Sequence, residues 1–167
     1  ETGDIVLVTN GTYATGSVTI GGVMNRIAVL KAITVKSVNG PDVTTIQGSS
    51  ASRCAYLANN AVLSGFTLTS GRLGSEEYAS KGGGAYAVGA VLTNCRIVGC
   101  SARVGGGVYG GTLVDCMVSG NTANDFGGGV YDAIVTDCGV SNNSSGLWGG
   151  GSCGGALSNC VVIGNYA

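Results

Sequence analysis

A short sequence unit recurs along this chain with a period close to 22 residues. Each copy contains three consecutive glycines, followed after several residues by a Leu or Val, two residues that are both polar in three of the four copies, and a cysteine. The four cysteines are 21, 22 and 22 residues apart, at Cys95, Cys116, Cys138 and Cys160. A repeat of this length is typical of one turn of a solenoid, in which each coil packs only against its neighbours. The repeat therefore predicts a stack of coils.

The composition excludes several other classes of protein. The 167 residues include 32 glycines without a period of three, which excludes collagen. A charged fraction of 10% and a hydrophobic fraction of 44% are unlike those of disordered chains. No run of 18 apolar residues predicts a transmembrane helix. With a net charge of −1 and no basic stripe, we expect no binding of nucleic acid.

The segment around each cysteine predicts two short strands joined by a sharp corner. With the Leu or Val of the repeat counted as position one, apolar residues occupy positions one, four and six. Positions one and four cannot lie on the same face of one continuous strand, because every second residue of a strand lies on one face. The third position holds residue types that tolerate a positive φ, at Gly65, Asn94, Asp115, Asp137 and Asn159. A second corner is predicted at Gly99, Gly120, Asn142 and Gly164.

An asparagine column follows the second corner, and we name it the asparagine ladder: Asn121, Asn143 and Asn165, with Cys100 in the preceding coil. Stacked asparagines can hydrogen-bond to one another and to buried backbone groups. The four cysteines of the repeat predict a second internal column, the cysteine ladder. Side chains in register on parallel strands point the same way, which suits a disulfide poorly, so we expect reduced thiols acting as small apolar residues. The pattern assigns no partner to Cys54, Cys100 or Cys153.

The chain is expected to form one β-helix domain over residues 4–167. Residues 1–3 resemble a remnant of a secretion vector. Residues 4–50 predict less regular coils, with strands at 4–8, 18–20, 26–30, 33–38 and 44–47, and residues 51–167 predict regular coils with a loop insertion at 72–81. We expect Leu30, Ile33 and Val35 to repeat the later Leu–Cys–Ile spacing. A small β-sandwich before residue 50 is the alternative, and we expect the segment to belong to a longer protein.

These features predict an all-β fold, a right-handed single-stranded parallel β-helix with coils of about 22 residues. Two elements also resemble the repeats of chlamydial polymorphic outer membrane proteins and related bacterial surface β-helices. The first is an aliphatic form of their Phe-x-x-Asn element, at 118–121, 140–143 and 162–165, and the second is the glycine triplet before Ala85, Val108 and Val130. The resemblance implies the β-helix fold and a place on a bacterial cell surface.

Candidate catalytic and metal-binding residues are few, because the chain has no histidine. Asp115 and Asp137 are the closest match to the paired carboxylates of polysaccharide-active enzymes, but they alternate with Asn94 and Asn159, which the corner geometry explains. Asp125 with Asp132, or Glu76 with Glu77, could supply carboxylate oxygens to a calcium ion. Our preferred interpretation is that these residues are solvated acids in loops and bind no metal. We therefore expect no catalytic residue, metal or cofactor.

The loops before the glycine triplets carry the candidate binding residues. Val104, Phe126 and Trp148 are 22 residues apart, and the insertion adds Glu76, Glu77 and Tyr78. Variable loops of a solenoid lie on one edge, where exposed aromatic rings could stack on sugars or anchor a protein. Our preferred alternative is that Val104, Phe126 and Trp148 fold inward and fasten the loops to the coil.

The function predicted from these features is a non-catalytic structural or adhesion segment, secreted or on a bacterial cell surface. Its expected partners are a glycan or a host or cell-surface protein, with end-to-end self-association through uncapped coils. A fragment of a carbohydrate-active β-helix enzyme is the second hypothesis. An ice-binding-like repetitive surface is the third hypothesis, although the column that would form it, at Thr93, Val114, Thr136 and Ser158, contains three different residue types.

Overall fold

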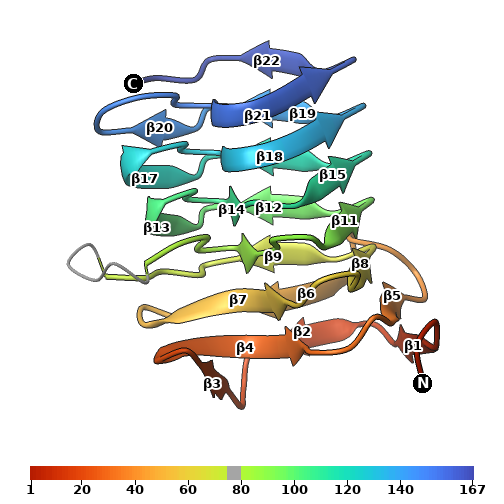
Figure 1. The fold of residues 1–167 in the computed structure, drawn as a ribbon. Coiled ribbons are helices and arrows are strands. Elements are labelled where there is room, and N and C mark those ends of the chain that lie inside the picture. The colour runs from red at the N-terminus through yellow and green to blue at the C-terminus, as the bar shows by residue number, and fades with distance from the viewer. Residues whose placement is uncertain (75–79) are drawn as a thin grey trace.

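The protein is all-β, and its strands stack in parallel sheets. The computed structural model describes residues 1–74 and 80–167, which contain a twelve-stranded, a seven-stranded and a three-stranded sheet and no helix. The chain rises from the N-terminus to the C-terminus through successive layers, each stacked on the one before it (Figure 1). Every named strand pair in these residues is parallel except β3–β4. The arrangement is consistent with a parallel β solenoid.

Strands with the same role in successive repeats lie directly above one another. The twelve-stranded sheet contains β1 (Ile5–Val8), β3 (Val18–Ile20), β4 (Val23–Val29), β5 (Thr34–Ser37), β7 (Ser52–Leu57), β8 (Val62–Ser64), β10 (Ala85–Tyr86), β11 (Val91–Thr93), β14 (Val108–Tyr109), β15 (Thr112–Val114), β18 (Val130–Thr136) and β21 (Ser152–Ser158). The seven-stranded sheet contains β2 (Gly11–Tyr13), β6 (Thr44–Gln47), β9 (Thr67–Thr69), β12 (Arg96–Val98), β16 (Met117–Ser119), β19 (Gly139–Ser141) and β22 (Val161–Ile163). The three-stranded sheet contains β13 (Ser101–Val104), β17 (Thr122–Phe126) and β20 (Ser144–Ser145).

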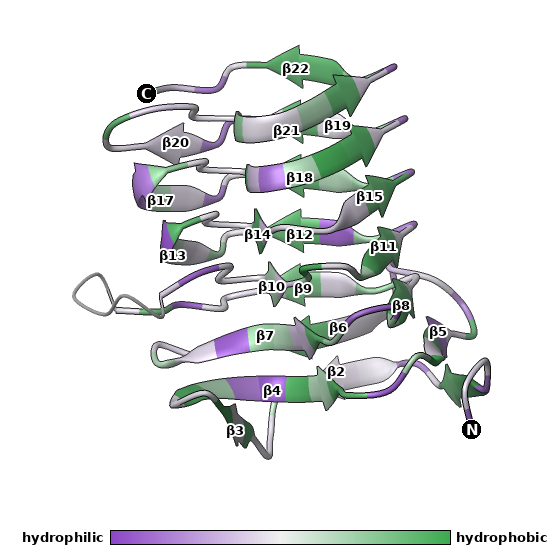
Figure 2. Ribbon diagram, in the orientation of Figure 1, coloured by the Kyte–Doolittle hydropathy of each residue, from purple (hydrophilic) through white to green (hydrophobic). Residues whose placement is uncertain are grey.

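The register of the strands aligns the apolar residues of the repeat into continuous buried columns. One column is fully buried at Leu63, Leu92, Leu113 and Val135, and another at Leu68, Ile97, Val118 and Val140. Buried and more exposed positions alternate along β18 from Ala133 to Thr136, and Figure 2 shows a hydrophilic patch in this strand followed by a hydrophobic stretch. Because burying one such side chain stabilises a fold by about 1.5–3 kcal/mol, these columns hold the coils together. The three residues of β22 are exposed.

The corners have the backbone conformation that their residue types favour. The first corner has φ between 49° and 79° at Gly65, Asn94, Asp115, Asp137 and Asn159. The second has φ between 53° and 65° at Gly99, Gly120, Asn142 and Gly164. A single left-handed residue turns the chain so that the apolar side chains on both sides of the corner point inward.

The early coils differ from our prediction in two places. Val35 pairs with Leu63, and Ile46 pairs with Leu68, so Val35 occupies the Leu position of the repeat and not the Ile position. The predicted alignment of Leu30, Ile33 and Val35 is therefore wrong, because residues 38–43 form a long connection where later coils have one corner residue. The prediction also missed β2, where Gly11 begins a strand that pairs with β6.

The cysteine ladder lies inside the coils as free thiols. The backbone N–H of Cys95 donates to Sγ of Cys116 at 3.4 Å, and that of Cys116 donates to Sγ of Cys138 at 3.2 Å. All seven cysteines are free; Cys153 and Cys160 are half-buried and the other five are buried. The hydrogen bond with Cys116, together with burial, raises the pKa of the Cys138 thiol.

We expect the native protein to react rapidly with iodoacetamide at pH 8 only at Cys153 and Cys160. The other five thiols are buried and out of reach of an alkylating reagent, so they should react only after denaturation. Peptide mass spectrometry after a short pulse of reagent measures the pattern, and a guanidinium-denatured sample is the control. Rapid labelling of Cys116 or Cys138, or a disulfide between them, would contradict the ladder.

Candidate functional site

Val104, Phe126 and Trp148 form a column, which we call the outer column. Val104 is in register with Phe126, and Phe126 forms a β-bridge with Trp148. The rings of Phe126 and Trp148 are 5.4 Å apart and tilted by 34°. Trp148 is 69% exposed, and the other two are half-buried. Trp148 therefore does not fold inward, as our preferred alternative expected, whereas for the half-buried Val104 and Phe126 that alternative stays a prediction.

A second row of rings, which the sequence analysis did not single out, runs beside the outer column. This tyrosine column contains Tyr56, Tyr86, Tyr109 and Tyr131. Neighbouring rings are 5.3–5.4 Å apart and nearly parallel, with interplanar angles of 5–13°. The signal was present, because a tyrosine is the second residue after three of the glycine triplets. The tyrosine column meets the outer column where Phe126 lies 6.5 Å from Tyr131.

The tyrosine column presents ring edges and hydroxyl groups to solvent, because its ring faces cover one another. None of the four hydroxyls makes a hydrogen bond within residues 1–74 and 80–167, and none is a buried unsatisfied atom there. A phenolic hydroxyl is both a donor and an acceptor. The column therefore offers a regular row of free hydrogen-bonding groups along the stacking direction.

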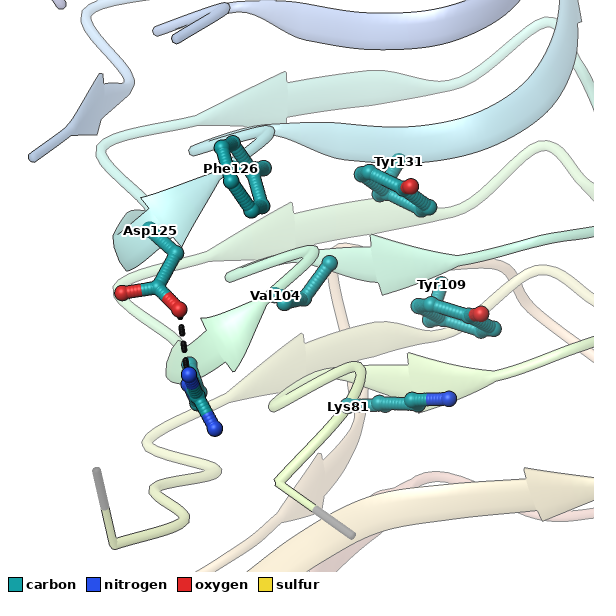
Figure 3. A pocket seen from close by; sticks show the side chains of 7 residues that line it. Lys81, Val104, Tyr109, Asp125, Phe126 and Tyr131 are labelled. Atoms are coloured by element: carbon teal, nitrogen blue, oxygen red, sulfur yellow. Dashed lines mark hydrogen bonds and ion pairs between the residues drawn. The ribbon is translucent and has the colours of Figure 1, made fainter. Parts of the chain in front are cut away.

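Charged side chains flank the rings. The Nζ atom of Lys81 lies 4.8 Å from the ring centroid of Tyr109, and the guanidinium carbon of Arg53 lies 5.4 Å from that of Tyr86, both cation–π distances. On the other side, Nε of Arg103 donates to Asp125 Oδ2 at 2.6 Å. Figure 3 shows Lys81, Tyr109 and Tyr131 on one side of this region, with Asp125 on the other.

These groups surround a shallow hollow, the upper hollow, of about 200 Å³, lined by Lys81, Arg103, Val104, Tyr109, Asp125, Phe126 and Tyr131. Pockets that enclose a small ligand have volumes of about 300–1,000 Å³. The upper hollow is smaller than that, and its lining comes from successive coils. A ligand that lies along the surface fits this geometry better than a molecule that must be enclosed.

The aligned aspartates lie away from the aromatic rings. Asp115 and Asp137 are the left-handed corner residues, with φ of 53° and 55°, and Asp137 accepts a hydrogen bond from Asn159. Their residue type is explained by the backbone conformation that the corner needs. Within residues 1–74 and 80–167, no group of three or more Cys, Asp or Glu side chains could hold a metal ion. The candidate residues Glu76, Glu77 and Tyr78 lie outside the described residues.

Fold and surface together define a class of protein: stacked parallel strands that carry two adjoining columns of aromatic and apolar side chains on one face. Comparison with protein-family models, with curated protein sequences and with solved structures gave no match. Among the residues that the structure describes, no helix has the length and apolar character needed to cross a membrane.

Proposed function

We propose that this chain is a non-catalytic adhesion segment, a right-handed single-stranded β-helix of the bacterial surface type, secreted or displayed on the cell. It binds a glycan along the face formed by the tyrosine column and the outer column. The observation that carries the proposal is the alignment of six aromatic rings from successive coils beside free hydroxyl groups. The right-handed preference of β-crossover connections supports the handedness.

A glycan matches the chemistry of this face. Aromatic rings pack well against apolar C–H surfaces, and the hydroxyls of the tyrosine column can exchange hydrogen bonds with sugar hydroxyls. Trp148 is mostly exposed, and an exposed ring of this size gains much apolar contact when a ligand covers it. The resemblance to chlamydial surface repeats supports the cellular location. End-to-end association through the exposed β22 is part of the same proposal.

Replacing Trp148 with alanine should weaken glycan binding about tenfold or more, the loss expected when an aromatic anchor of an interface is removed. Because Trp148 is exposed, the change should leave thermal stability almost unaltered. A glycan array identifies the ligand, and isothermal titration calorimetry then measures the affinity of each variant.

The matched control is Leu147→Ala, which removes an adjacent side chain that is 54% exposed. We expect this variant to bind as the original protein does. An equal loss in both variants, or the absence of any bound glycan, would contradict the proposal. Turnover of a polyuronide that is lost in Asp115→Asn or Asp137→Asn would instead favour the carbohydrate-active enzyme.

A further inference from the structure

Arg53 is a buried cation without a carboxylate partner among the described residues. Its side chain is 2% exposed. The guanidinium donates to Asn25 Oδ1 at 2.6 Å and to the backbone carbonyls of Lys81 at 2.7 Å and Gly82 at 2.9 Å, which are all neutral acceptors. Asn25 is itself fixed by a hydrogen bond to the carbonyl of Val23 at 2.7 Å. The positive charge is therefore held rigidly and is not neutralised by these contacts.

A second cation lies beside it at the surface. Lys81 is half-buried and borders both the upper hollow and a neighbouring one. The neighbouring hollow, which we call the Arg53 hollow, has a volume of about 260 Å³ and is lined by Ile20, Gly21, Val23, Arg53, Tyr56, Lys81 and Tyr86. Among the residues that the structure describes, its lining contains two cations, two tyrosines and no acid. In the upper hollow, by contrast, Asp125 balances Arg103.

The electrostatic consequence is an attraction for negative charge. Burial lowers the pKa of Arg53 to about 10, so the group still carries its charge at neutral pH. A charge in a partly buried environment acts through a lower effective dielectric constant than one in water, and its field reaches neighbouring groups more strongly. An anion in the Arg53 hollow would relieve the unbalanced charge of Arg53 and Lys81 together.

We propose that the Arg53 hollow binds a carboxylate or sulfate group, and that the glycan recognised by this face is therefore acidic. This inference rests on the proposed function. Lys81 makes the direct ionic contact, the hydroxyls of Tyr56 and Tyr86 donate hydrogen bonds to the anion, and Arg53 adds its field from beneath the rings. Lys81 also lies against Tyr109, so an acidic sugar in the Arg53 hollow would continue into the upper hollow (Figure 3).

Calorimetry with three kinds of probe tests the inference: a uronic acid oligosaccharide or its sulfated counterpart, a neutral oligosaccharide of the same length, and sodium acetate or sulfate alone. We expect the acidic oligosaccharide to bind most tightly. Lys81→Gln should weaken that binding about tenfold, the size expected for one charge-assisted hydrogen bond. Lys81→Arg should retain most of the affinity, and Lys36→Gln, at an exposed lysine on β5, is the matched control.

The outcomes separate the two proposals. Equal binding of acidic and neutral oligosaccharides, unaffected by Lys81→Gln, would overturn the anion site while leaving glycan binding in place. Acetate or sulfate binding as tightly as the acidic oligosaccharide would overturn the assignment to a glycan. No binding of any oligosaccharide, neutral or acidic, would overturn the proposed function as well. Preference for the acidic probe that falls in Lys81→Gln and not in Lys36→Gln supports the inference.

Discussion

Replacing Asn143 with leucine should destabilise the protein by about 3–9 kcal/mol, because three buried polar groups lose their partner at about 1–3 kcal/mol each. Asn143 Oδ1 accepts from the backbone N–H and from Nδ2 of Asn121, both at 2.9 Å, and its Nδ2 donates to the carbonyl of Val118 at 2.9 Å. Asn143 is fully buried, so water cannot replace it readily. The free energy of unfolding from urea denaturation measures the effect.

The adjacent residue provides the control for this prediction. Asn142 is an exposed corner residue with φ of 53°, and glycine occupies the same corner at positions 99, 120 and 164. Asn142→Gly should therefore change the free energy of unfolding by less than about 1 kcal/mol, since glycine adopts this conformation without strain. A small effect of Asn143→Leu, similar to that of Asn142→Gly, would show that the asparagine ladder does not hold the coils together.

Gly128→Ala should destabilise the protein by about 3 kcal/mol or more and could prevent folding, because the new methyl group has no space. A Cβ atom on Gly128 would lie 2.2 Å from the carbonyl oxygen of Ser144 and 2.4 Å from that of Gly150. Both oxygens belong to the backbone of the next coil, so the coils would have to separate. That movement would break the hydrogen bond from the N–H of Gly128 to the carbonyl of Gly149, which is 3.1 Å long.

Gly139 is the matched control, because it is also a glycine without a positive φ but has open space around it. No heavy atom lies within 4 Å of the position of its Cβ. Gly139→Ala should leave stability unchanged or raise it by up to about 1 kcal/mol, since alanine reduces the entropy of the unfolded chain. Thermal denaturation measures the melting temperatures of the Gly128→Ala and Gly139→Ala variants. Equal melting temperatures would contradict close packing at the glycine triplet that contains Gly128.

The regular part of the fold was predictable from the sequence because its coils repeat one local pattern. A residue type that tolerates positive φ at a fixed position, such as Asp115 or Asn94, marks a corner without knowledge of its neighbours. The early coils were harder to predict. The connection at residues 38–43 replaces a single corner residue, so the spacing between Val35 and Ile46 no longer reveals which strand each belongs to.

The sequence by itself determined the period, the corners and the buried columns, because each depends on the preference of a single residue repeated at a fixed interval. Only the tertiary structure decided which side chains meet across coils. Tyr56 belongs to the tyrosine column although no glycine triplet precedes it, and Trp148 points outward. Likewise, Arg53 contacts Asn25 and the carbonyl of Lys81, both 28 residues away. Such contacts depend on how far each coil is displaced from the next, and that displacement is set by packing between coils.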